Sequence, residues 1–154
     1  MNLFLIVILG VNSFLVILLY FIMRRKRKLF SERFGAVLAM SGTGIFSLNI
    51  GLVVHLLVKD EMSLLSVLSI LIGGLIGFLF GSLVKFQSIL TGFTHGVVGG
   101  IMGTMLAAVI LNPALCNLPS SYLLNISQNI MIFSVFGTIL SVISMGLLCY
   151  SLRV

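Results

Sequence analysis

The sequence is poor in charged residues. Of its 154 residues only 8% are Asp, Glu, Lys or Arg, whereas 60% are hydrophobic and the mean hydropathy is +1.30. A soluble domain of ordinary composition carries about 25% charged residues. So few charges cannot cover a water-facing surface, and a disordered chain would be far less apolar. The composition therefore excludes a soluble globule and a disordered chain, and it indicates a multi-pass membrane protein.

Acidic residues are the scarcest charged type. The three acids, Glu32, Asp60 and Glu61, lie between the long apolar stretches or at their ends. Carboxylate pumps, aspartyl intramembrane proteases and di-metal carboxylate sites need carboxylates inside the membrane or the bundle core. The sequence therefore disfavours these three classes. It also has no phosphate-binding loop between a strand and a helix, and we expect no nucleic-acid partner.

Five apolar stretches account for nearly all of the chain. They run over about 2–23, 34–58, 62–84, 88–111 and 124–150. A helix needs ~20 apolar residues to cross a ~30 Å hydrocarbon core, so each stretch is long enough. The expected fold class is an all-α integral membrane protein, in which one transmembrane domain of five helices covers 1–154. The first stretch lacks a basic leader and precedes a basic run, so we expect a retained span and not a signal peptide.

Basic residues set the expected orientation. With the N-terminus outside, eight of the nine lie on the inner side and only Lys59 lies outside. Because cytoplasmic loops carry an excess of Lys and Arg, we expect an N-out, C-in protein of the cell (inner or plasma) membrane. A basic run follows the first span: Arg24, Arg25, Lys26, Arg27 and Lys28. It is interpreted either as a topogenic anchor at the phosphate level or as a contact for anionic lipid or an acidic partner.

Glycines are concentrated in the third and fourth stretches. Nine of sixteen lie between 73 and 103, and eight of them form a pattern mirrored between Phe86 and Gln87. The mirror pairs are Gly81 with Gly92, Gly77 with Gly96, Gly74 with Gly99, and Gly73 with Gly100. Such spacing lets helix backbones approach closely in lipid. It predicts a glycine-zipper hairpin that turns near Lys85–Ser88, with each pair at one membrane depth.

The glycine pattern has several functional interpretations. Packing alone is the simplest of them. The glycines could also leave room for a permeant species, let helices slide between two states, or pair between chains in a homo-oligomer.

Two histidines and their polar neighbours are candidates for a polar route. Thr43, Ser47 and His55 lie on one four-residue stripe of the second stretch, and Thr91 and His95 lie in the fourth. Histidine within a membrane span is rare and often functional. The simpler interpretation of each is a neutral imidazole that is hydrogen-bonded to a neighbouring hydroxyl or carbonyl.

The fourth stretch also carries soft metal ligands. His95, Met102 and Met105 fall within an arc of about 80° on a helix, and Cys116 follows in the next loop. Imidazole, thioether and thiolate together suit a soft cation such as Cu(I).

Cys116 and Cys149 lie at opposite ends of the last hairpin, so we do not expect a disulfide between them.

Enzymatic chemistry is not expected. A Ser41–His95 dyad is conceivable because both residues should lie at a similar depth. With five spans and no carboxylate to orient the histidine, this interpretation remains remote.

Two functions therefore compete. The first is a small transport or permeation protein, with a soft metal cation as one candidate substrate. The second is a non-catalytic accessory or assembly subunit of a larger membrane complex, with the glycine-rich faces as docking surfaces.

The predicted orientation is testable with topology reporters. Because eight of nine basic residues then lie inside, a reporter fused at residue 30 or at the C-terminus should report the cytoplasm. One fused at residue 118 should report the outside. A cytoplasmic signal from residue 118 would rule out the five-span arrangement.

Overall fold

The computed structural model describes residues 2–26, 32–58, 62–84, 86–112 and 126–152. Five α-helices make up these ranges, each long and apolar enough to cross a membrane. They are α1 (Asn2–Lys26), α2 (Glu32–Leu57), α3 (Met62–Gly81), α4 (Phe86–Leu111) and α5 (Ile126–Ser151). The predicted all-α fold with five helices of transmembrane length is confirmed, and the helix ends lie within three residues of the expected span ends.

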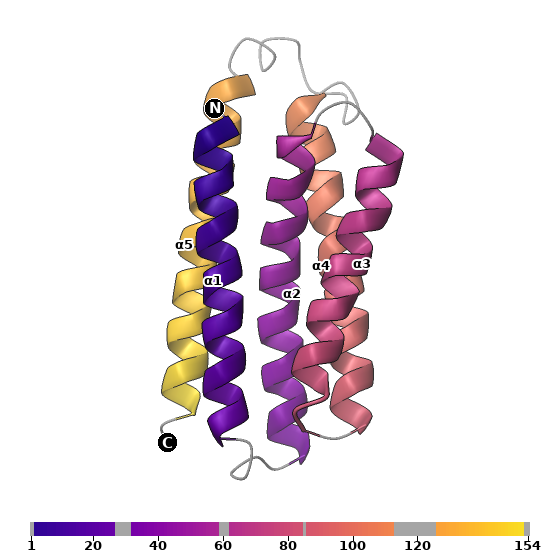
Figure 1. Ribbon diagram of the computed structural model, residues 1–154, viewed down its shortest axis with the longest axis vertical. Helices are drawn as coiled ribbons and strands as arrows, with labels where there is room; N and C mark the ends of the chain where they lie inside the picture. Colours follow the sequence, from indigo (N-terminus) through magenta and orange to yellow (C-terminus); the bar gives the residue numbers. More distant parts are fainter. Residues whose placement is uncertain (1, 27–31, 59–61, 85, 113–125, 153–154) are drawn as a thin grey trace.

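Helix α2 lies at the centre of the bundle. In Figure 1 it stands between the pair α1 and α5 on one side and the pair α3 and α4 on the other, and it contacts all four. Burial agrees with this placement. In the most apolar 18-residue stretch of each helix, 61% is buried inside the bundle for α2, against 22% for α1 and 28% for α5. Helix α2 therefore joins two helix pairs that otherwise share little surface.

Helices α3 and α4 form an antiparallel hairpin, but its turn comes earlier than expected. Helix α3 ends at Gly81 and α4 begins at Phe86, so 86–88 of the expected turn at Lys85–Ser88 are already helical, and Lys85 lies outside the described residues. The backbone N–H of Ser82 donates to the carbonyl of Phe78 (2.9 Å), and that of Val84 donates to the carbonyl of Gly81 (3.2 Å). The early turn brings the first turn of α4 against bare backbone, because a Cβ built at Gly81 would lie 2.5 Å from the carbonyl oxygen of Ser88.

The backbones of α3 and α4 meet through glycines that interdigitate. A Cβ built at Gly96 would overlap the carbonyl of Gly73 and lie 3.2 Å from the Cα of Gly77. One built at Gly92 would lie 2.5 Å from the carbonyl oxygen of Gly77 and 3.4 Å from the nitrogen of Gly81. Each of these α4 glycines therefore lies between two successive α3 glycines, and not level with a single mirror partner. The register differs from the expected one because the turn comes earlier.

Two of the expected mirror pairs are replaced by other contacts. Gly100 was expected opposite Gly73, but its built Cβ lies nearest the carbonyl oxygen of Ser69, at 2.9 Å. Gly74 was expected opposite Gly99, but its built Cβ lies nearest the side chain of Phe93, at 3.1 Å.

Gly99 packs against α2 instead, as does Gly103. A Cβ built at Gly99 would overlap the hydroxyl of Ser47 and lie 2.6 Å from the carbonyl oxygen of Gly44. One built at Gly103 would lie 2.9 Å from the nitrogen of Leu52. Helix α4 thus presents bare backbone on two faces, one toward α3 and one toward α2.

Apolar side chains fill the bundle in two clusters, one toward each end. The cluster near the C-terminal end of α1 contains Leu19, Met23, Leu38, Phe46, Ile50, Ile76, Phe80, Leu83, Leu148 and Leu152. The cluster near its N-terminal end contains Leu5, Ile8, Leu52, Val53, Leu56, Ala107, Ile110 and Ile130.

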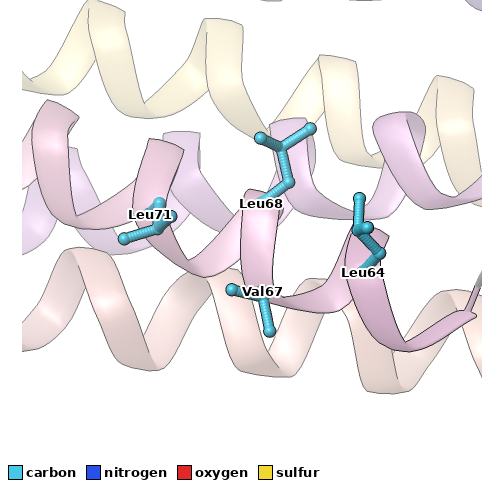
Figure 2. A pocket seen from close by; sticks show the side chains of 4 residues that line it. All are labelled: Leu64, Val67, Leu68 and Leu71. Atoms are coloured by element: carbon cyan, nitrogen blue, oxygen red, sulfur yellow. The ribbon is translucent and has the colours of Figure 1, made fainter.

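The outer surface is also apolar. Figure 2 shows one part of it, a hollow lined by four side chains of α3, namely Leu64, Val67, Leu68 and Leu71. Their exposed fractions range from 44% to 62%. A surface of this kind suits contact with lipid chains.

The close glycine contacts predict unequal costs for leucine substitutions. Gly77→Leu or Gly96→Leu should lower the free energy of unfolding in detergent by roughly 1–3 kcal/mol, because the new side chain must push α3 and α4 apart. The matched controls are Gly10→Leu and Gly146→Leu, since a Cβ built at either meets no described atom within 4 Å. Equal losses in all four variants would contradict the close approach.

Candidate functional site

Ten polar side chains are buried among the described residues. They are Asn12, Thr43, Ser47, Asn49, His55, Ser69, Ser88, Thr104, Ser134 and Ser141. A polar group in the hydrocarbon layer must find a partner inside the protein, because no water is available there. A buried polar group that is hydrogen-bonded within the protein has a structural explanation, whereas one without such a partner is a candidate functional group.

All three hydroxyl groups of the predicted polar route bond within their own helix. The hydroxyl of Thr43 donates to the carbonyl of Ala39 (2.6 Å), and that of Ser47 donates to the carbonyl of Gly44 (3.3 Å). Thr91 donates to the carbonyl of Gln87 (3.1 Å). Such bonds to the preceding turn are the usual way for a helix to satisfy hydroxyl groups. These three residues therefore have a structural explanation.

Asn49 links α2 to α5. Its amide nitrogen donates to the carbonyl of Gly137 (2.6 Å) and to the hydroxyl of Ser141. A Cβ at Gly137 would overlap the Asn49 amide oxygen, so this glycine makes the approach possible. Neither Gly137 nor Ser141 was predicted as a site residue from the sequence. The available signal was their four-residue spacing, which places two small residues on one face of the last span.

A second amide joins α1 to α5. The side-chain nitrogen of Asn12 donates to the carbonyl of Ile8 (3.0 Å) and to the hydroxyl of Thr138 (3.4 Å). Amide and hydroxyl groups between membrane helices contribute on the order of 0.6 kcal/mol each, so they direct helix pairing more than they add stability.

His55 lies near the C-terminal end of α2 and is 2% exposed. Its Nδ1 has no hydrogen-bond partner among the described residues. It does not line the same cavity as His95, and the structure therefore separates the two histidines.

A groove lies between α4 and α5, with α2 as its floor. Its volume is about 310 Å³. It is lined by Gly44, Ile45, Leu48, Asn49, His95, Val98, Gly99, Met102 and Leu140. The α2 residues of this set lie at the middle of Glu32–Leu57, so the groove lies near the middle of the bundle. It exists because α4 and α5 make little contact there and because Gly44 has no side chain to fill the space.

His95 is the ionisable residue of this groove. Its Nδ1 lies 2.9 Å from the carbonyl oxygen of Thr91. A carbonyl oxygen only accepts hydrogen bonds, so Nδ1 carries the proton, and a neutral ring keeps its lone pair on Nε2. The ring is thus oriented by its own helix, and Nε2 can accept a hydrogen bond or bind a metal ion.

The predicted soft ligands are only partly brought together. Met102 lines the groove with His95, whereas Met105 lies outside the groove lining. Both methionine side chains are more than half exposed, at 55% and 63%. Cys116 lies outside the described residues. Within the described ranges, no group of three or more His, Cys, Asp or Glu residues could hold a metal ion.

Ser41 and His95 do not form the hydrogen bond that a catalytic dyad would need. No hydrogen bond joins them in the described part of the chain, where Nδ1 of His95 lies against the carbonyl of Thr91. Ser41 is exposed and lies outside the groove lining.

The basic run after α1 is described as far as Lys26. Arg24 and Arg25 are exposed, whereas the Lys26 ammonium donates to the carbonyl of Leu152 (2.7 Å). Arg27 and Lys28 lie outside the described residues.

Comparisons of this chain with models of protein families, with curated proteins and with solved structures find no match. The strongest feature of the groove is an oriented imidazole near the middle of the bundle, where Asn49 is the other polar side chain of the lining.

Proposed function

We propose that the protein is a small membrane transport protein whose substrate binds in the groove between α2, α4 and α5. The supporting observation is the placement of His95, which has an oriented ring and lines a groove near the middle of the bundle. Ligand sites are mostly apolar, with a few polar groups that select the ligand. An ionisable residue inside a membrane span is costly to keep there, so a functional role is the default hypothesis.

In the proposed orientation the bundle spans the cell (inner or plasma) membrane, with the N-terminus outside and the C-terminus in the cytoplasm. The balance of basic residues supports this choice. The close glycine contacts of α3 and α4 act as a glycine zipper that holds α4, and with it His95, in a fixed position.

A soft cation is the candidate substrate that the groove favours. Imidazole nitrogen and thioether sulfur both prefer such ions, and His95 and Met102 line the same groove. Seven residues of helical rise separate them by ~10 Å along α4, so they act as successive and not simultaneous ligands. Successive weak sites suit conduction, because the ion must leave each site as readily as it enters.

An accessory subunit that uses its glycine-rich faces as docking surfaces has less support. The eight mirrored glycines are all buried within one chain, where α2, α3 and α4 cover them. They could serve as docking faces for a partner or a second copy only if the bundle opened. An assembly role would therefore use the apolar outer surface instead.

The transport proposal is tested with Ag⁺ as a redox-stable soft cation. Proteoliposomes that contain the full chain should accumulate Ag⁺ faster than empty vesicles, as measured by elemental mass spectrometry. His95→Gln or Met102→Leu should lower the initial rate about tenfold, equivalent to ~1.4 kcal/mol in the activation free energy of transport.

Met105→Leu is the matched control, because it removes the same thioether from the same helix outside the groove lining. It should leave the rate unchanged. Uptake equal to that of empty vesicles would reject transport of soft cations, and equal losses from Met102→Leu and Met105→Leu would reject the groove as its site.

A further inference from the structure

A second cavity opens between α1 and α5, at the end of the bundle where the basic run begins. Its volume is about 450 Å³, and it is lined by Ile22, Lys26, Gly146, Cys149 and Tyr150. We propose that this cavity is a binding site for one anionic phospholipid, with the phosphate at Lys26 and the start of an acyl chain over Gly146. This proposal is independent of the transport proposal.

Lys26 supplies an ammonium group that is already held in place. It donates to the carbonyl of Leu152, which follows the end of α5 (2.7 Å). The last carbonyls of a helix have no donors within the helix and carry partial negative charge, so a lysine is stabilised there. An ammonium has three N–H groups, and this bond uses one. The position of the charge is thus set before any lipid binds.

Gly146 opens the apolar part of the cavity. A Cβ built there meets no described atom within 4 Å, so the backbone lies beside open space. Gly146 lies four residues before Tyr150, and Ile22 lies four before Lys26. Each interval is ~6 Å of helical rise. The cavity therefore extends from the level of the charge about one helical turn into the apolar layer, as a headgroup with its first methylene groups requires.

The surroundings of the cavity favour an anion at its rim. Arg24 and Arg25 are exposed on the last turn of α1, and neither α1 nor α5 contains an acidic residue. Tyr150 is 70% exposed, and tyrosine is enriched where the bilayer meets water. Basic pockets between membrane helices are a known way to bind lipid phosphate groups.

A second copy of the chain fits this cavity less well than a lipid does. A symmetric dimer through α1 and α5 would bring the Lys26, Arg24 and Arg25 side chains of both copies together. Like charges placed so close repel each other. An anionic lipid instead neutralises them.

The test compares phosphatidylglycerol with phosphatidylcholine of the same acyl chains, added to the purified full chain in mild detergent. Native mass spectrometry measures the lipid retained, and thermal unfolding measures the stabilisation. The wild type should retain phosphatidylglycerol in preference to phosphatidylcholine. Lys26→Gln should weaken phosphatidylglycerol binding about fivefold, and Lys26→Arg should keep it.

Gly146→Leu tests the apolar part of the cavity, with Gly10→Leu as its control, because both glycines border open space on the two helices of this pair. Only Gly146→Leu should abolish the preference for phosphatidylglycerol.

In a Cys116→Ser background, phosphatidylglycerol should also slow alkylation of Cys149, which lines the cavity.

Three results would overturn the proposal: equal retention of the two lipids by the wild type, an unchanged preference in Gly146→Leu, or a dimer that Gly146→Leu dissociates. The last result would assign the cavity to a second copy of the chain.

Discussion

The approach of the α4 backbone to two neighbouring helices determines how the bundle is arranged. Water exclusion does not drive helices together in lipid, so packing and hydrogen bonds must do so. Helix α4 meets α3 through Gly92 and Gly96, and it meets α2 through Gly99 and Gly103. These contacts group three helices closely and leave the opposite side of α2 for α1 and α5. On that side α2 is joined to α5 by a hydrogen bond, which the side-chain amide of Asn49 donates to the backbone carbonyl of Gly137.

The same constraint accounts for the groove. Because its glycines draw α4 toward α2 and α3, α4 makes little contact with α5. The space that remains lies over Gly44, where no side chain fills it, and His95 lies at its edge. A tightly packed region thus creates an opening beside it. The proposed site consequently lies on rigid helices, as the precise placement of a ligand requires.

The number and length of the helices could be predicted from the sequence, because each apolar run is long enough to span a membrane and ends at charged or polar residues. Helix partners could not be predicted in the same way. Four-residue spacing shows that glycines share a face, but it does not show which helix covers that face. Gly99 was therefore assigned to α3, whereas it packs against α2. The mirror pattern also does not show where α3 ends. Because α3 ends at Gly81 and α4 already begins at Phe86, the register between the two helices differs from the mirrored one.

The candidate site was predictable only in part, for a related reason. His95 and Met102 were recognised as ligand types on one helix, and both line the groove. The groove itself is formed by three helices, of which α2 and α5 are distant in sequence. Its Asn49 is held by Gly137 and Ser141, and these contacts follow from the placement of α5 beside α2. Local periodicity carries no information about such long-range placement.

The most direct test of the close backbone approach is solid-state NMR of the chain in lipid bilayers, with ¹³C-labelled glycine. The expected result is cross-peaks from Gly73 to Gly96 and from Gly77 to Gly92, because these backbones are in contact. Gly10 should give no cross-peak to another helix. Absence of both glycine contacts would contradict the arrangement, as would contacts that arise only between differently labelled chains in a mixed sample.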